Sequence, residues 1–238
     1  MRKSSVDEIR RRFDADVERF SNLETGQSAT VDAPVSLELI ARAAAAVCPR
    51  AEALLDIGCG AGNYTLKLRE RLPLGRVALV DLSLPMLERA RERIRAAGDI
   101  EIDARQIDIR EADFPAESFD VAVAAATLHH LRGDAEWERV FGAVYGWLKP
   151  GGSFWISDLV EHKPPAIQAL MWERYGEYLE ALKGREYRDQ VFAYVQQEDT
   201  PRPLAWQLER LRAAGFATVE VLHKNACFAA FGAVKSRG

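Results

Sequence analysis

The chain has 238 residues, of which 48% are hydrophobic and 29% are charged, and its formal net charge is −4 at neutral pH. This length accommodates one sizeable hydrophobic core, and the negative charge gives no general attraction for a nucleic-acid backbone. We therefore expect a soluble globular protein, with nucleic acid disfavoured as a partner.

The cysteines and the N-terminal segment bear on the cellular compartment. Cys48, Cys59 and Cys227 are widely separated and form no C-x-x-C motif, which favours a reducing environment. Residues 1–20 are densely charged and lack the apolar core of a signal peptide, and the alanine-rich run at residues 43–47 is too short to span a bilayer. The expectation is a cytoplasmic protein without a membrane partner.

The first part of the chain is predicted to be helical. Apolar residues recur at steps of three and four over residues 2–20, namely Val6, Ile9, Phe13, Val17 and Phe20. Residues 22–33 are expected to form a loop. A second helix is expected over residues 34–47, with Pro34 in its first turn and Pro49 just past its end. Residues 1–48 are therefore expected to form an N-terminal helical cap.

The most informative segment is the sequence ALLDIGCGAGNYT at residues 53–65. A short apolar run that contains Asp56 leads directly into Gly58, Gly60 and Gly62. Glycine adopts positive φ at little cost and lets a ligand lie against bare backbone amides. The segment predicts a buried strand, a cofactor-binding turn and a helix start, although similar turns also serve NAD enzymes.

Beyond this turn, strand and helix patterns alternate. Strands are expected at residues 53–57, 76–81, 100–107, 119–124, 153–158, 218–223 and 226–234, and helices at residues 63–71, 84–97, 134–148 and 203–214. This alternation predicts an α/β fold, with a doubly wound, Rossmann-like seven-stranded sheet that is mostly parallel and has an antiparallel last strand. Residues 1–238 form one domain in this interpretation, with a helical insertion after the fifth strand at residues 163–200.

Acidic residues at two further strand ends make the glycine turn more specific. Asp81 ends the strand after the turn, where a carboxylate can accept hydrogen bonds from both ribose hydroxyls of an adenosine cofactor. Asp108 and Ile109 follow the next strand, where they could accept from an adenine amino group and pack on its ring. The sequence therefore predicts an adenosyl ligand at the carboxyl edge of the sheet.

With these residues in place, the sequence resembles the class I S-adenosylmethionine-dependent methyltransferases. The motifs LLDIGCGAG (54–62), VDLS (80–83), QID (106–108), FDVAV (119–123) and LKPGG (148–152) occur in that family's order and spacing. The resemblance is specific over residues 51–159 and looser toward both ends. It implies S-adenosyl-L-methionine as the cofactor.

The resemblance also implies which residues bind that cofactor. Gly58 and Gly60 would lie against the methionine moiety, Asp56 would support the turn, and Asp81 would bind the ribose. The full set of expected cofactor-binding residues is Asp56, Gly58, Cys59, Gly60, Asp81, Leu82, Met86, Asp108, Ile109 and Ala125. Purely structural roles remain open for some of these positions. Asp56 could brace the loop without touching a ligand, Met86 could be a core residue, and Gly62 could serve helix packing.

His129 and His130 are the candidate catalytic residues. They follow the strand at residues 119–124, at the rim of the predicted cofactor site, where a neutral imidazole of ordinary pKa could accept a proton from an acceptor. Such a pair could also merely brace its loop. No metal site is expected, because adjacent histidines should point apart and His162 and His223 lack ligands at suitable spacing.

Acceptor choice is expected to depend on Phe13, Phe20 and the insertion. Trp172, Tyr175 and Tyr178 recur at helical steps and could line an acceptor pocket, with the arginines of the insertion available for a carboxylate, namely Arg174, Arg185 and Arg188. The same aromatic stripe could instead pack on its own domain or on a second subunit, so a homodimer stays open.

Three classes of function remain at this point. The negative charge, compact length and aromatic insertion favour a methyltransferase that acts on a small-molecule acceptor. A tRNA-modifying methyltransferase or an enzyme of the carboxy-S-adenosylmethionine type is the second hypothesis. A non-catalytic regulator that binds S-adenosylmethionine is the third.

Overall fold

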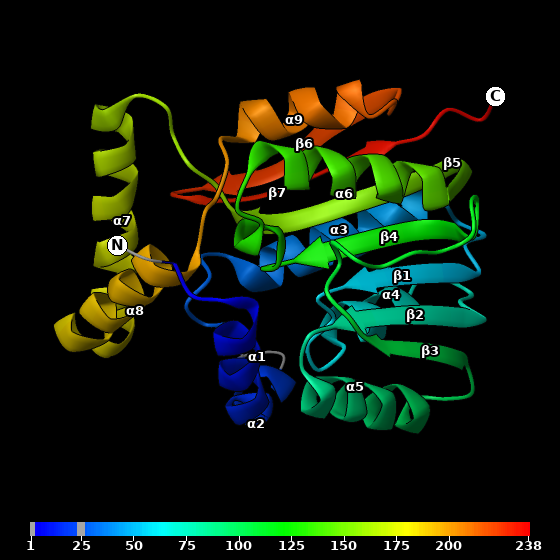
Figure 1. Cartoon of the computed structure of the whole chain (residues 1–238), viewed down its shortest axis with the longest axis horizontal. Helices are drawn as coiled ribbons and strands as arrows, with labels where there is room; N and C mark the ends of the chain where they lie inside the picture. Colours follow the sequence, from blue (N-terminus) through cyan, green and yellow to red (C-terminus); the bar gives the residue numbers. More distant parts are fainter. Residues whose placement is uncertain (1–2, 23–26) are drawn as a thin grey trace.

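The computed structural model describes residues 3–22 and 27–238, with the backbone alone for Arg19 and Phe20. Its strands form one seven-stranded sheet in the order β3-β2-β1-β4-β5-β7-β6 (Figure 1). The strands are β1 (Ala53–Ile57), β2 (Arg76–Asp81), β3 (Glu101–Gln106), β4 (Phe119–Ala125), β5 (Leu148–Leu159), β6 (Thr218–Asn225) and β7 (Phe228–Val234). β1 to β5 pair in parallel, and β7 runs antiparallel to β5 and β6. The predicted mixed, doubly wound sheet is confirmed.

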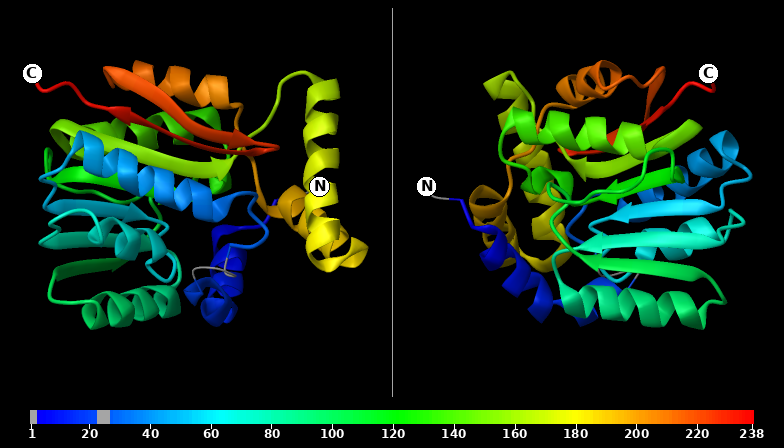
Figure 2. Two further views of the ribbon diagram at one scale, coloured as in Figure 1. Left: turned by 180° about the vertical axis from the view of Figure 1, so that it is seen from behind. Right: turned by 45° about the vertical axis from the view of Figure 1, so that its right-hand side comes forward.

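Helices cover both faces of the sheet because the central strands are apolar on both sides (Figures 1 and 2). α3 (Ala33–Val47), α4 (Asn63–Arg69) and α5 (Leu84–Ala96) pack on one face. α6 (Asp134–Trp147) and α9 (Leu204–Ala213) pack on the other. The rigid sheet thereby holds its strand ends in fixed positions.

The strand register brings three strand ends together. Ile57 at the end of β1 lies opposite Val80 of β2 and Ala124 of β4. The turns that follow these strands therefore leave the sheet side by side at its carboxyl edge. This is the edge where open parallel sheets bind ligands, at the point where strand order reverses.

The single N-terminal helix predicted over residues 2–20 is wrong in one respect, because the structure divides it into α1 (Val6–Ala15) and α2 (Val17–Ser21). Asp16 leaves helical geometry, with φ −111° and ψ 14°, and its amide donates to Phe13 instead of continuing the helical ladder. α1 starts at a capping box in which Ser5 and Glu8 satisfy each other's amides. Residues 23–26 of the predicted loop lie outside the described residues.

The insertion consists of α7 (Pro165–Lys183) and α8 (Arg185–Glu198), separated by Gly184. Both helices stand beyond the carboxyl ends of the strands, on the same side as α1 and α2 (Figure 1). A small core of their own joins α7 and α8 to the sheet, through Tyr175, Leu179, Val195 and Cys227 among others. The fifth strand is longer than predicted, since Leu148 already pairs with Phe119 of β4.

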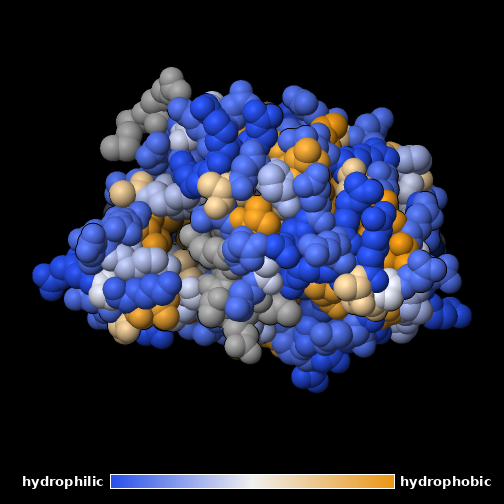
Figure 3. Space-filling view, turned by 90° about the horizontal axis from the view of Figure 1, so that it is seen from below, coloured by the Kyte–Doolittle hydropathy of each residue, from blue (hydrophilic) through white to orange (hydrophobic). Residues whose placement is uncertain are grey.

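The surface seen from below the view of Figure 1 is mostly hydrophilic, with separate apolar patches (Figure 3). Among the described residues, no helix combines the length and apolarity that crossing a bilayer requires.

Candidate active site at the carboxyl edge of the sheet

The turn after β1 approaches its surroundings closely at Gly58 and leaves space at Gly60. A Cβ on Gly58 would lie 2.0 Å from the hydroxyl oxygen of Thr127, whereas a Cβ on Gly60 would meet no atom within 4 Å. Gly62 packs on α5, with Ala90 at 3.3 Å from such a Cβ, so its predicted packing role fits the structure. All three glycines have positive φ. The backbone at Gly60 is therefore open to a ligand.

Two carboxylates brace this turn. Asp56 is buried and accepts a hydrogen bond of 2.6 Å from the hydroxyl of Thr65, and burial raises its pKa to about 7. Asp81 accepts from the amides of Gly60 at 2.8 Å and Ser83 at 2.9 Å, while burial raises its pKa. A carboxylate has about four lone-pair sites, so Asp81 can still accept from a ligand.

Asp108 already accepts several hydrogen bonds within the protein, whereas the sequence suggested a carboxylate available to a ligand. Arg110 donates to it from Nε at 2.9 Å and from a terminal guanidinium nitrogen, and the Arg110 amide donates at 2.9 Å. Burial alone would raise the pKa of Asp108, but the hydrogen bonds from Arg110 lower it overall. Arg110 also pairs with Glu136 at 3.2 Å. The third strand end thus carries an ion pair rather than a lone carboxylate.

A pocket of about 1040 Å³, its open mouth included, joins these strand ends; we call it the glycine-loop pocket. All ten residues predicted to bind a cofactor line it, and so does His130. Its wall also includes Val6, Ile9 and Phe13 of α1, together with Tyr64 and Arg110. The structure thus brings the predicted set together in one pocket that the N-terminal helix partly covers.

A second pocket of about 1210 Å³, the aromatic pocket, lies between the sheet edge and the insertion. Its aromatic residues are Phe13, Tyr175, Tyr187, Tyr194 and Phe228, and its polar groups include Arg12, His129, Asp158 and Asp199. The two pockets share a wall formed by Phe13, Gln27, Ala125, Ala126 and His130. A ligand in one pocket would therefore adjoin a ligand in the other.

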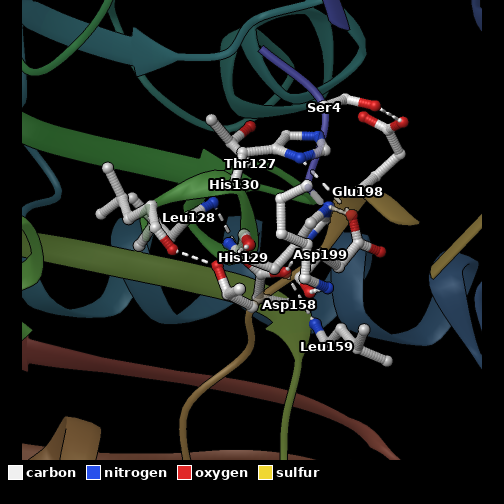
Figure 4. Close-up of polar contacts among 12 residues, drawn as sticks. Ser4, Thr127, Leu128, His129, His130, Asp158, Leu159, Glu198 and Asp199 are labelled. Atoms are coloured by element: carbon white, nitrogen blue, oxygen red, sulfur yellow. Dashed lines mark hydrogen bonds and ion pairs between the residues drawn. The ribbon is translucent and has the colours of Figure 1, made fainter. Parts of the chain in front are cut away.

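His129 is buried between two carboxylates (Figure 4). Its Nδ1 forms a short hydrogen bond with Asp158 on β5, and its Nε2 lies 3.6 Å from Asp199 after α8. Burial alone would lower its pKa, but the two carboxylates outweigh burial and raise the pKa to about 9. The predicted imidazole of ordinary pKa is therefore wrong for His129, whose two carboxylate neighbours favour the protonated ring.

His130 lies against His129 rather than pointing away from it, contrary to our expectation. The two ring centroids are 4.3 Å apart in an edge-to-face contact, and the Nδ1 of His130 lies 3.4 Å from Asp199 Oδ1. Burial, His129 and Arg132 lower the pKa of His130 well below its ordinary value. Burial raises the pKa of Asp199 to about 6. The surroundings thus shift the pKa values of the two histidines in opposite directions, although both rings lie beside the same carboxylate.

The aromatic residues of the predicted stripe on the insertion make different contacts. Tyr175 lines the aromatic pocket, whereas Trp172 packs on Tyr175 and Phe192, and Tyr178 donates to the carbonyl of Ser28 at 2.8 Å. Most of the predicted stripe therefore fastens the insertion to the domain. The side chain of Phe20 lies outside the described residues.

The arginines predicted to meet an acceptor carboxylate face elsewhere. Arg185 and Arg188 pair with Glu180 on the insertion, and Arg174 donates to Asn225 at 3.3 Å. Arg12 of α1 lines the aromatic pocket instead, where it pairs with the buried Glu198 at 2.8 Å. Its guanidinium also lies 4.9 Å from the centre of the Tyr194 ring.

Sequence reasoning missed Asp158, Asp199, Arg110 and Arg12 as site residues. Asp158 had a signal, because it is an acidic residue near the end of a strand, like Asp81. Arg110 stands two positions after Asp108, a spacing that could have indicated a local ion pair. No sequence pattern indicated a site role for Asp199 or Arg12, because their positions depend on how the insertion and α1 dock on the sheet.

Comparisons with known proteins identify methyltransferases as similar proteins. A family model described as a methyltransferase domain matches residues 54–152. The chain is 27% identical over 190 residues to a carboxy-S-adenosyl-L-methionine synthase of Hydrogenovibrio crunogenus, covering 77% of this chain and 73% of that protein. It is 29% identical over 189 residues to a demethylmenaquinone methyltransferase of Lactococcus lactis, with the same two coverages.

Among solved structures, a phosphoethanolamine N-methyltransferase of Haemonchus contortus in complex with phosphomonomethylethanolamine and S-adenosylhomocysteine is similar in fold. The TM-score is 0.69 at 19% identity, over 98% of this chain and 60% of that one. At this level of identity the likeness concerns the fold.

Proposed function

The chain belongs to the class I S-adenosylmethionine-dependent methyltransferases, and we propose that it transfers the methyl group to a small-molecule acceptor held in the aromatic pocket. S-Adenosylmethionine is the cofactor of this family. The observation that carries the proposal is the shared wall between the glycine-loop pocket and the aromatic pocket. Because the pockets adjoin, an acceptor atom can approach a donor methyl without leaving the protein.

The residues at the strand ends indicate how the donor would bind. We assign the open backbone at Gly60 to the methionine part of the donor, and Asp81 to the ribose hydroxyls. Ile109 and Leu82 offer apolar surface for the adenine, beside the Asp108–Arg110 pair. The sulfonium is already activated toward attack, so the protein's task is to align the acceptor and exclude water.

The acceptor side combines aromatic and aliphatic side chains with polar groups. Tyr175, Tyr187 and Tyr194 line a pocket whose shape suits an apolar or aromatic acceptor. The demethylmenaquinone methyltransferase among the relatives supports this class of acceptor, since its name indicates a quinone derivative. We place His129 and His130 at the reacting end of the acceptor, because His130 lies in the shared wall and His129 packs against it.

The experiment is a screen of acceptors of different chemistry, with release of S-adenosylhomocysteine as the readout. We expect turnover with apolar aromatic alcohols, thiols or amines and none with tRNA. Release only with tRNA would contradict the small-molecule proposal. If the protein binds S-adenosylmethionine but releases no S-adenosylhomocysteine with any class of acceptor, that result would contradict the proposal as well.

A second candidate is the formation of carboxy-S-adenosylmethionine, which the Hydrogenovibrio crunogenus relative favours because its similarity extends over 77% of this chain. Arg12 lines the aromatic pocket, where one terminal guanidinium nitrogen pairs with Glu198. Its other terminal nitrogen has no hydrogen-bond partner among the described residues, so it could meet a carboxylate of the substrate. Mass spectrometry of the nucleoside that copurifies with the protein distinguishes the candidates. A carboxylated derivative would favour the second candidate, and S-adenosylmethionine or S-adenosylhomocysteine the first.

A further inference from the structure

We propose that His129, His130 and Asp199 bind a divalent transition-metal ion at the junction of the two pockets, with Zn²⁺ as the best match to the ligands. This inference deepens the proposed function, because the ion would lie where the acceptor meets the donor. It concerns a binding site, however, and can be tested without knowing the acceptor.

The geometry of the three ligand atoms suits one ion. Asp199 Oδ1 lies 3.6 Å from His129 Nε2 and 3.4 Å from His130 Nδ1, and one ligand atom from each residue lies within 4.8 Å of the others. Zinc bonds of about 2.1 Å to nitrogen and oxygen place tetrahedral ligand atoms roughly 3.4 Å apart. The cluster therefore needs only small shifts to close around the ion.

Three polar atoms of this cluster lack a hydrogen bond of good geometry within the described residues. They are the two ring nitrogens of His130 and Asp199 Oδ1, which meets the two imidazoles only at 3.4 Å and 3.6 Å. The Asp199 side chain is only 3% exposed, and Oδ1 faces both imidazoles (Figure 4). Buried polar atoms without partners are costly, so a ligand at this point would remove a penalty that the ligand-free protein carries.

The surroundings of His129 match those of a metal-bound histidine. Its Nδ1 donates to the carboxylate of Asp158, and its Nε2 is directed at the cluster. The ion would take the place of the Nε2 proton, which is released on binding. Metal-binding histidines usually donate their other ring N–H to a carboxylate in this way. Asp158 is itself fixed by the amides of Leu128 at 2.9 Å and Leu159 at 2.7 Å.

The local charge also favours a cation. Two carboxylates, Asp158 and Asp199, face two imidazoles, whereas the neighbouring Glu198 already pairs with Arg12. Lys3 and Arg132 approach through the backbone carbonyls of Asp199 and Glu198 and do not occupy Asp199 Oδ1. Two imidazoles and one carboxylate form a ligand set used by zinc enzymes that keep a further position for water or substrate.

The open position would face the acceptor. His129, His130 and Asp199 all line the aromatic pocket, and His130 also lines the glycine-loop pocket. An oxygen, nitrogen or sulfur of the acceptor could therefore bind the ion while it faces the donor methyl. The ion would position the acceptor atom by coordination.

The test is a calorimetric titration of the chelator-treated full chain with Zn²⁺, and a parallel titration with Co²⁺ followed by visible absorption. We expect one ion per chain and the d–d bands of nitrogen- and oxygen-bound Co²⁺. Asp199→Asn and His130→Gln should each weaken binding by about 10-fold to 100-fold or more, and Asp158→Asn by about 10-fold to 100-fold.

His162→Gln is the matched control, because His162 lines neither pocket and its ring Nδ1 lies 3.3 Å from Gln168 Oε1. It should bind the ions as the wild type does. Binding of S-adenosylmethionine, measured in the same samples, shows whether each variant is folded and tests the cofactor side separately. No stoichiometric ion in the wild type, thiolate bands from a cysteine site, or equal affinity in folded cluster variants would overturn the metal site and leave the methyltransferase assignment intact.

Discussion

The carboxylate of Asp81 accepts a 2.8 Å hydrogen bond from the amide of Gly60, so that the end of β2 holds the glycine turn that follows β1. This contact joins the two most diagnostic positions of the sequence in one structure. A ligand that lies against Gly60 in the glycine-loop pocket would therefore also be close to Asp81.

Asp81→Ala should weaken the binding of S-adenosylmethionine. The substitution removes the proposed acceptor for the ribose hydroxyls and releases the Gly60 amide, at a cost of about 1–3 kcal/mol in binding free energy. Calorimetry measures the change. Asp103→Asn on β3 is the control, because Asp103 pairs with Arg105 away from the glycine-loop pocket. Equal affinity of Asp81→Ala and the wild type would remove Asp81 from the site.

The glycines of the turn should respond differently to alanine. Gly58→Ala forces a methyl group into Thr127 and should destabilise the fold by more than about 2 kcal/mol. Gly60→Ala meets no protein atom and should cost only about 1–2 kcal/mol for its left-handed backbone. Its methyl group would, however, occupy the space assigned to the donor.

Urea unfolding and calorimetry together test this pair. We expect Gly60→Ala to fold and to bind S-adenosylmethionine weakly. Gly142→Ala in α6 serves as the control, since a Cβ there meets no atom within 4 Å and helices favour alanine. Normal cofactor affinity in Gly60→Ala would show that the ligand does not approach this backbone.

Stability of the ligand-free protein should fall as the pH rises from about 4 to about 7. Burial raises the pKa of Asp56 to about 7, against 3.8 in its unperturbed state. Between these values the folded state binds one more proton than the unfolded state, so the stabilisation is complete below the unfolded pKa and has been lost once the pH exceeds the folded pKa. The loss is on the order of 1 kcal/mol per pH unit between about pH 5 and pH 7, and it levels off above pH 7.

Urea unfolding at pH 5 and pH 7 measures this loss. Asp56→Asn should reduce the dependence, because its side-chain oxygen can still accept from Thr65 without carrying a charge. Asp199, whose pKa burial raises to about 6, accounts for part of the remainder. Asp103→Asn should retain it. An identical pH dependence in Asp56→Asn and the wild type would assign the effect to other groups.

His129→Ala should slow turnover with an identified acceptor and leave the affinity for S-adenosylmethionine unchanged. The side chain lines the aromatic pocket and fixes the position of His130 by ring contact. Misplacement at the reacting end lowers turnover on the order of 10-fold to 100-fold. Steady-state kinetics and calorimetry separate the two effects, with His162→Ala as the control. Unchanged turnover in His129→Ala would exclude His129 from the acceptor site.

The sheet was predictable because its signals are local. Apolar runs such as 53–57 and 76–81 coincide with the observed β1 and β2, and the turn glycines and Asp81 occupy the strand ends that their order along the chain implies. Since parallel strands share one carboxyl edge, the cofactor-side residues follow from sequence order alone.

The acceptor side was not predictable in the same way. Its polar cluster joins His129 after β4, Asp158 on β5 and Asp199 after α8, and the last of these depends on how the insertion docks. Two neighbouring histidines were expected to diverge, but the short 3₁₀ helix at Leu128–His130 lets both rings face Asp199. Long-range docking of this kind leaves no periodic signal in the sequence.

Calorimetric titration of the wild-type chain with S-adenosylmethionine and, separately, with NAD⁺ tests the central claim most directly. The strand-end site predicts one S-adenosylmethionine bound per chain and little or no heat with NAD⁺. Preference for NAD⁺, or failure of the folded chain to bind S-adenosylmethionine, would contradict it.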